Sequence, residues 1–163
     1  MDGFKIRRCT PDDAATVARH RVEMFREMGD VPTDDLAREL LAKSILAMTA
    51  TLVDGTYVGW FAIDGGGKVI AGAGVHIKPS LPRISHDHLR VEDTPVPLAV
   101  NVYTESDWRG RGVARALMRV VMEWASAQGT DRIVLHASAA GRPLYESLGF
   151  RPTNEMRWFV PKT

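Results

Sequence analysis

The spacing of hydrophobic positions in the first part of the chain changes from a short apolar run to helical periodicity. Residues 4–9 predict a first strand. Thr10 and the following Pro-Asp-Asp then predict a capped helix start, and apolar side chains recur at helical spacing from Val17 to Met28. A second helical stripe runs from Leu36 to Met48. The first part of the chain is therefore expected to fold as a strand followed by two helices.

The rest of the chain predicts a hairpin and then strands and helices in alternation. Residues 57–64 and 68–77 are apolar, β-prone and joined by three glycines, as in a β-hairpin. Residues 78–97 form a long polar connection. After it we expect a strand, a helix, a strand, a short helix and a final strand, at 98–104, 111–128, 131–137, 141–148 and 156–160.

This order of elements indicates an α/β (α+β) fold. We expect a mixed, mostly antiparallel central sheet of about 6–7 strands with about four helices, containing one parallel pair of strands around the 111–128 helix. A chain of 163 residues suits one domain, and it contains neither an internal repeat nor a linker. We therefore treat 1–163 as a single domain.

Composition narrows the class of protein. With 45% hydrophobic and 25% charged residues the chain is ordinary and globular, and a net charge of +1 argues against a nucleic-acid partner. The single cysteine, Cys9, excludes an internal disulfide and is expected to be a buried strand residue. The N-terminal segment lacks the apolar core of a signal peptide, and no apolar run is long enough to cross a bilayer. These features predict a cytoplasmic protein without a membrane partner.

The segment ESDWRGRGVARALM, residues 105–118, places a basic glycine turn directly before a predicted helix. The first turn of a helix has unpaired N–H groups and partial positive charge, and a glycine without Cβ lets an anion approach the backbone. The turn therefore predicts a phosphate site, with a plain strand-to-helix connector as the alternative. It matches neither the Walker pattern nor the dinucleotide fingerprint. The residues concerned are Arg109, Gly110, Arg111, Gly112 and Arg115.

Two segments together resemble a known family. RGRGVA at 109–114 resembles the acetyl-CoA signature of the GCN5-related N-acetyltransferases (GNAT), and LYESLGF at 144–150 is similar to a second segment of that family. They occur in the family's order and at its usual separation. The resemblance is strong over 98–160 and rests on element order alone over 1–97. It implies that acetyl-CoA is the co-substrate, and that its acetyl group moves to a primary amine of a small molecule or peptide by direct attack in a ternary complex.

The resemblance also assigns the cofactor-binding residues. Backbone N–H groups of the turn would hold the pyrophosphate of coenzyme A, with Arg115 near the phosphates. The preceding strand would pair with the pantetheine arm, and the strands 98–104 and 131–137 would splay apart to admit it. Ser138 stands where relatives often carry an asparagine that touches the pantetheine. The full set is Val102, Tyr103, Thr104, Arg109, Gly110, Arg111, Gly112, Val113, Ala114, Arg115 and Ser138.

The catalytic assignments are less complete. Tyr145 matches the family's tyrosine, which protonates the leaving thiolate; the alternative is a packing residue. The glutamate used as a base by histone-acetylating relatives falls at Leu98, so this chain lacks it. His136 has a side chain whose ordinary pKa suits proton removal at neutral pH, and Asn101 could orient an amine. A water relay without a single base stays open.

The acceptor side is undefined by sequence. The two early helices and the 78–97 connection would face the acceptor, where Glu23 could attract a cationic amine. His86 and His88 have the spacing of a metal pair but no third ligand nearby, so we predict no metal site.

Other functions remain open at this point. The chain could be a coenzyme A-binding regulatory module without transferase activity, an acyltransferase using a longer acyl-CoA, or an unrelated nucleotide-binding protein. Members of the family are often dimers, which leaves a homodimer open, with 156–160 as an exposed edge strand.

Overall fold

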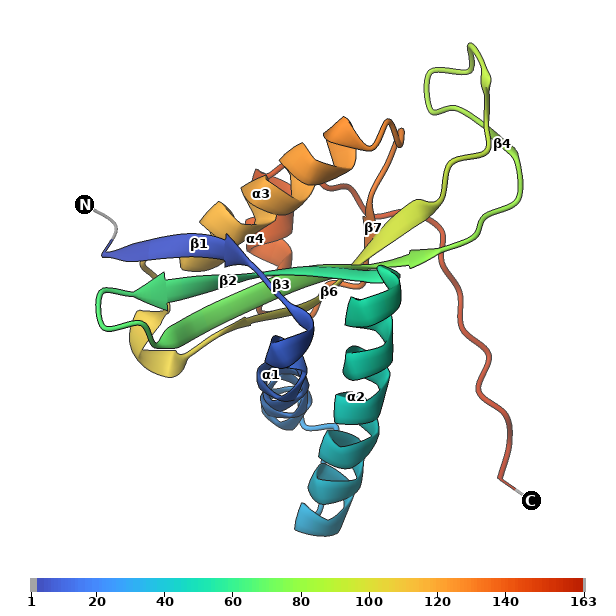
Figure 1. Cartoon of the computed structure of the whole chain (residues 1–163). Coiled ribbons are helices and arrows are strands. Elements are labelled where there is room, and N and C mark those ends of the chain that lie inside the picture. Colours follow the sequence, from blue (N-terminus) through green and yellow to red (C-terminus); the bar gives the residue numbers. More distant parts are fainter. Residues whose placement is uncertain (1–2, 163) are drawn as a thin grey trace.

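The computed structural model describes residues 3–162, in which a twisted central sheet separates two layers of helices (Figure 1). The sheet has five strands in the order β1-β2-β3-β6-β7. Neighbouring strands are antiparallel except for β6 and β7, which are parallel. The bounds are Phe4–Arg8 for β1, Tyr57–Asp64 for β2, Val69–Lys78 for β3, Val96–Thr104 for β6 and Val134–Leu135 for β7.

Each face of the sheet is covered by a pair of helices (Figure 1). On one face lie α1, Ala14–Glu27, and α2, Asp34–Asp54; on the other lie α3, Val113–Ala127, and α4, Arg142–Ser147. Short 3-10 turns at Pro11–Asp13 and Ser106–Trp108 precede α1 and α3. The predicted α/β class, with a mostly antiparallel sheet and four helices, is confirmed.

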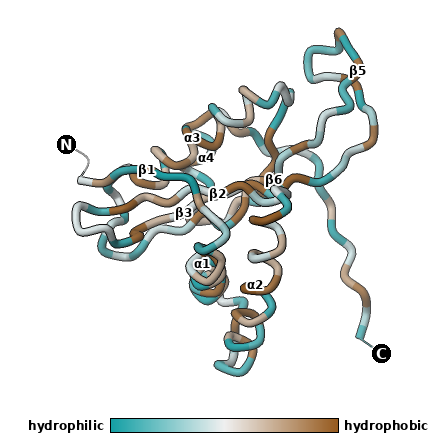
Figure 2. Tube along the Cα trace, in the orientation of Figure 1, coloured by the Kyte–Doolittle hydropathy of each residue, from teal (hydrophilic) through white to brown (hydrophobic). Residues whose placement is uncertain are grey.

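Hydrophobic burial on both faces of the sheet holds these layers together. In Figure 2 the tube is brown along the central strands, where the two apolar clusters meet the sheet. The larger cluster joins the sheet to α3, with Leu117, Met118 and Val121 fully buried. The smaller cluster joins Phe61 and Tyr57 to the α1–α2 side. Side-chain direction along a strand therefore decides which pair of helices a residue faces.

The structure changes some element boundaries. Helix α3 begins at Val113 rather than at 111, because Gly112 has a left-handed φ of 77° that a helix cannot contain. Strand β7 has two residues instead of the seven expected. The connection 78–97 holds a small separate hairpin of β4, Arg83–Ile84, and β5, Val91–Glu92. It is tied to the body by Arg83, which donates to the buried carboxylate of Asp131 at 2.6 Å.

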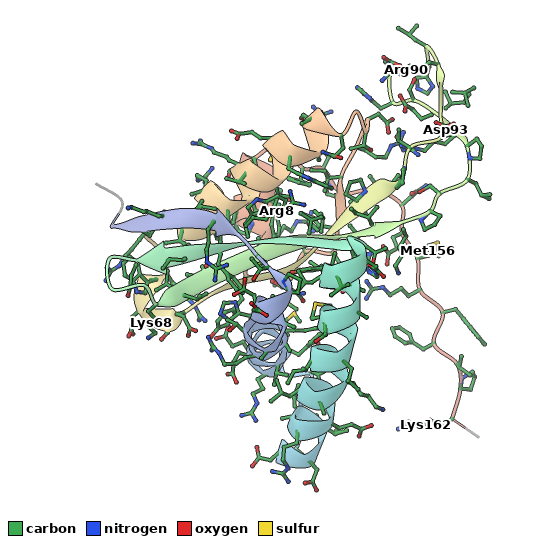
Figure 3. All side chains as sticks on the ribbon, in the orientation of Figure 1. Arg8, Lys68, Arg90, Asp93, Met156 and Lys162 are labelled. Carbon is green, nitrogen blue, oxygen red and sulfur yellow. The ribbon has the colours of Figure 1, made fainter. Side chains whose placement is uncertain are left out.

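The predicted final strand at 156–160 is wrong. Residues 151–162 form neither helix nor strand and run away from the sheet (Figure 1). Figure 3 shows the side chains of this tail standing clear of the body between Met156 and Lys162. Met156 is 94% exposed and Trp158, Phe159 and Val160 are 78–80% exposed. The segment has the composition of a strand but no neighbouring strand in the described chain to pair with.

Among the helices of residues 3–162, none combines the length and apolar character needed to span a membrane.

Candidate functional site

The parallel pair β6–β7 opens in the middle of the sheet. The two strands pair only at Leu98–Val134 and Ala99–Leu135, while β6 continues to Thr104. The pairing of β6 with β3 shifts register just after Val100, and Asn101 has a positive φ of 56°. A positive φ together with a register shift is the signature of a β-bulge, which bends a strand away from its neighbour. The edge of β6 that faces β7 is therefore free beyond the bulge to pair with another extended chain.

A cavity of about 440 Å³ lies where β6 ends and α3 begins. Seven of the residues expected to bind the cofactor line it: Thr104, Arg109, Gly110, Gly112, Val113, Ala114 and Arg115. Trp108 and Leu144 complete the lining, and neither was predicted from sequence. Leu144 belongs to α4, so the second family-like segment borders the same cavity as the glycine turn.

The cavity wall presents backbone N–H groups. Gly110 and Gly112 both have left-handed φ values, 72° and 77°, and a Cβ added at either would meet no atom within 4 Å. The first backbone bond of α3 runs from Ala116 N to the Gly112 carbonyl, so the three preceding N–H groups have no partner inside the helix. Glycine is thus needed for the backbone shape, and the turn leaves open space in front of a positive helix end.

The arginines around the turn are held in place by their neighbours. Arg109 donates to the Thr104 carbonyl at 2.9 Å and pairs with Glu27 of α1. Arg115 donates to the Ser147 hydroxyl at 2.9 Å, which links α3 to α4. Arg111 stacks its guanidinium 5.0 Å from the Trp108 ring centre and does not line the cavity. Positive charge at the turn is therefore fixed in position.

Thr104 adds a polar side chain to the lining of this cavity. Its hydroxyl is buried and has no hydrogen-bond partner among the described residues, although a buried hydroxyl normally has one. Thr104 lines the same cavity as the residues whose N–H groups are unpaired at the helix start. These orphaned donors and acceptors fit a ligand that is both polar and anionic.

The other residues predicted to contact the pantetheine lie outside the cavity lining. Val102 packs against the α3-side cluster, and Tyr103 points to the opposite face, where its ring lies 4.9 Å from the centre of His20. The hydroxyl of Ser138 accepts a hydrogen bond from the Gly141 N–H at 3.1 Å. Ser138 thereby shapes the approach to α4.

Tyr145 lies in α4, half-buried against Phe150 with ring centres 6.0 Å apart. Its ring also lies against Gly141, where an added Cβ would approach the ring to 2.9 Å. Burial raises the pKa of the Tyr145 hydroxyl above its usual 10.0, so the group stays protonated at neutral pH. No hydrogen bond to this hydroxyl forms within residues 3–162. The structure therefore brings Tyr145 and Ser138 together around Gly141.

The three predicted catalytic residues do not form one cluster. His136 is the residue directly after β7 and is half-exposed, with its Nε2 bonded to Glu155. Asn101 points to the α1 side of the sheet and is only 3% exposed. In the described part of the chain, no group of three His, Cys, Asp or Glu side chains is placed to hold a metal ion.

Asn101 belongs to a polar chain that sequence reasoning missed. Its Nδ2 donates to the Tyr57 hydroxyl at 3.3 Å, and its Oδ1 accepts from Arg21 at 2.9 Å. His76 lies opposite Tyr57 in the sheet register. Burial and the charges of Lys78 and Arg21 lower the pKa of His76, against the opposing effect of Asp54. The sequence marked Asn101 as a polar residue inside an apolar strand and placed Arg21 on a helix expected to face the acceptor, but it did not predict the contact between them.

Comparisons with known proteins identify the family to which the chain belongs. The model of a family described as Acetyltransferase (GNAT) family matches residues 19–150, a range that contains every candidate site residue named above. The chain is 25% identical over 158 residues to aminoglycoside N(6')-acetyltransferase type 1 of Stenotrophomonas maltophilia, covering 94% of this chain and 90% of that protein.

Two solved structures share the fold over nearly the whole chain. A GCN5-related N-acetyltransferase from Ralstonia eutropha JMP134 has a TM-score of 0.84 at 33% identity, covering 97% of this chain and 99% of that one. A predicted acetyltransferase from Clostridium acetobutylicum, solved with acetyl-CoA, has a TM-score of 0.80 at 24% identity, covering 96% of each chain. At that identity, the second likeness shows the fold alone.

Proposed function

The chain belongs to the acetyltransferase (GNAT) family and is an N-acetyltransferase; from that premise we propose that it moves the acetyl group of acetyl-CoA directly onto a primary amine of a small molecule or peptide. The observation that carries the proposal is the free edge of β6, which leads from the bulge at Asn101 straight to the helix start at Gly112. An extended arm ending in phosphates matches that path in both shape and charge.

In this proposal the chain holds acetyl-CoA mostly through its backbone. The residues from Gly110 to Ala114 direct N–H groups at the pyrophosphate, and Arg115 adds charge beside them. The free edge of β6 at Val102, Tyr103 and Thr104 pairs with the amides of the pantetheine arm as another strand would. Arg109 and Arg111 act indirectly, by fixing the turn through Glu27 and Trp108. Ser138 sets the position of α4 at the other side of the arm.

The acetyl group then lies at the bulge, where an N–H around Val102 would stabilise negative charge on its oxygen. The amine attacks the carbonyl carbon, and a tetrahedral intermediate forms. The C–S bond breaks as Tyr145 gives its proton to the departing sulfur, and the amine loses a proton to a base. His136 is the candidate base, since it stands one residue beyond the paired part of β7; water is the alternative. Asn101 acts on the acceptor side.

Ligand-dependent melting tests the proposal. A ligand that binds only the folded state raises the melting temperature, and a concentration of about 100 Kd adds about 2.7 kcal/mol. We expect acetyl-CoA and coenzyme A to raise it while ATP and NAD do not. A rise with ATP or NAD alone would instead support an unrelated nucleotide-binding protein.

Product analysis separates the remaining functions. Release of free thiol with an amine panel, followed by the mass of the product, distinguishes acetyl transfer from transfer of a longer acyl group. Binding of acetyl-CoA with no acceptor turned over would support a coenzyme A-binding regulatory module.

We further propose that the chain forms a homodimer. The tail and the outer side of α2 both carry large apolar side chains in solvent, among them Leu46 at 73%, Val53 at 69% and Trp158 at 78% exposed. Several large apolar side chains exposed in this way favour a contact with another protein. Since the tail has strand-like composition and finds no partner strand within residues 3–162, a second copy supplies one by symmetry.

A further inference from the structure

Resting on the transferase function proposed above, we propose that the acceptor amine also carries an anionic oxygen group, and that Arg21 of α1 binds it. The observation behind this is a guanidinium without an anionic partner, held beside the point where β6 leaves β7. Carboxylates and phosphates share the oxygen chemistry that a guanidinium recognises.

The charge of Arg21 is uncompensated within the described residues. Its side-chain hydrogen bond goes to the neutral Oδ1 of Asn101 at 2.9 Å, and its guanidinium lies 4.8 Å from the Phe25 ring centre. Other arginines on this side of the sheet have carboxylate partners: Arg7 with Asp13, Arg19 with Glu105 and Arg109 with Glu27. Arginine stays charged at neutral pH, and a half-buried unpaired charge is unfavourable until an anion joins it.

The guanidinium is also held in one place. Asn101 is buried, and its amide has one orientation because Arg21 can only donate: Oδ1 must face Arg21, which leaves Nδ2 to bind the Tyr57 hydroxyl. Tyr57 is fixed in turn: a Cβ added at Gly74 would come within 2.2 Å of its hydroxyl oxygen, and one at Gly59 within 2.9 Å of its ring. Two glycines thus make room for Tyr57, which orients Asn101, which orients Arg21. A rigid, preorganised charge is what a specificity site needs.

Its position relates it to the acetyl group. Asn101 is the bulge residue, and the next residue along β6, Val102, is the one whose N–H is proposed to face the acetyl oxygen. Arg21 therefore meets the acceptor one residue from the reacting carbon. The arrangement suits a compact molecule whose amine and anionic group are a few bonds apart, such as an amino acid.

The charges around this point favour an anion over a second ammonium group. His76 lies opposite Tyr57 in the sheet, and Lys78 follows two residues later in β3, so both face the side of Arg21. Burial, then the charges of Lys78 and Arg21, lower the pKa of His76 against the opposing effect of Asp54, so Lys78 rather than His76 adds positive charge here. The carboxylates of Glu105, Glu27 and Glu23 instead gather around Tyr103, whose pKa they raise together with burial. A polyamine would place ammonium groups against Arg21, which costs free energy at short distance.

The test compares acceptors with and without an anionic group. Thiol release from acetyl-CoA is measured with β-alanine against β-alaninamide and with O-phosphoethanolamine against ethanolamine, and spermidine serves as the cationic acceptor. In parallel, glutarate and inorganic phosphate are titrated against the coenzyme A complex by melting temperature. We expect the anionic member of a pair to have the higher kcat/KM, and the pair that responds distinguishes a carboxylate from a phosphate.

Variants of Arg21 make the assignment specific. Arg21→Gln should lower the kcat/KM for the anionic acceptor, or the affinity for the free anion, by about tenfold to a hundredfold. This is the range for hydrogen bonds to a charged group. The KM for acetyl-CoA should stay unchanged. Arg21→Glu should reverse the preference toward spermidine. Arg26→Gln is the matched control on the same helix, since Arg26 is exposed and pairs with Asp34 at 3.5 Å.

The outcomes separate this inference from the function on which it rests. Equal or better use of the uncharged acceptors, or no Arg21-dependent effect on acceptor or anion in either assay, overturns the inference. If acetyl-CoA still raises the melting temperature in that case, the transferase proposal stands. If acetyl-CoA does not bind at all, the transferase proposal fails first.

Discussion

Replacing Gly112 by glutamate should abolish coenzyme A binding with only a modest loss of stability. Gly112 has φ 77° and open space in front of its missing Cβ, so the substitution adds backbone strain of about 1–2 kcal/mol without a clash. The new carboxylate at the helix N-terminus stabilises the folded state by about 0.3–1 kcal/mol, which offsets part of that strain. Against a bound phosphate, a new charge about 4 Å away costs about 4 kcal/mol at an effective dielectric of about 20, close to a thousandfold in Kd.

Gly129→Glu at the other end of α3 is the matched control. Gly129 has nearly the same φ, 75°, and equally open space, but it lies outside the lining of the cavity. The strain is the same, while the helix dipole now opposes the carboxylate by about 0.3–1 kcal/mol. We therefore expect the larger fall in melting temperature for Gly129→Glu, where about 1 kcal/mol corresponds to about 2–4 °C.

Calorimetric titration with coenzyme A and melting curves of both variants measure the two effects. We expect stability and affinity to change in opposite directions: Gly112→Glu should be the more stable of the two variants, yet it should be the one that does not bind coenzyme A. Equal affinity in both variants would refute the assignment of the turn as the pyrophosphate site. So would a loss of affinity that merely follows the loss of stability.

Three further predictions test separate parts of the molecule. Tyr145→Phe should lower kcat by about 10²–10⁴-fold and leave the KM for acetyl-CoA nearly unchanged; wild-type kcat in steady-state thiol release would exclude Tyr145 as the acid. Burial lowers the pKa of His20 to about 4, so the unfolded chain binds more protons and stability should fall by about 3 kcal/mol as the pH drops from 6.5 to 4. Urea unfolding should show this loss in the wild type and not in His20→Leu. Deleting residues 156–162 should shift sedimentation from dimer to monomer, and an unchanged dimer would remove the tail from the interface.

Local sequence patterns predicted the part of the fold that local physics determines. The strand expected at 57–64 is β2 with the same bounds, because an apolar run followed by three glycines defines both a strand and its turn. The glycine turn and the helix after it were also visible, although a positive φ moved the helix start to Val113. Of the expected cofactor-binding residues around this turn, all but Arg111 line one cavity with Thr104, where a phosphate site was predicted.

Contacts between distant residues were not predictable in this way. Arg21 and Asn101 are 80 positions apart. The helical pattern places Arg21 on one stripe with Val17 and Met24, but it does not say which residue of a distant strand Arg21 contacts. The tail is a second case in which sequence patterns do not identify a contact partner. Its apolar, aromatic composition favours a strand, but a strand also needs a partner, and composition does not say which chain provides it.

The bulge at Asn101 connects the open sheet to both halves of the proposed chemistry. In a regular strand Val100 and Val102 would face the same side, yet Val100 packs on the α1–α2 side and Val102 on the α3 side. Asn101 has a positive φ, which asparagine tolerates better than most residues, and this one residue shifts the alternation of side chains between the two faces of the sheet. This shift turns Tyr103 toward His20 and leaves Asn101 itself on the α1 side, bonded to Arg21. The same distortion that frees the strand edge for acetyl-CoA therefore carries a polar group to the acceptor side, and so places the two substrates of the proposed reaction on either side of one residue.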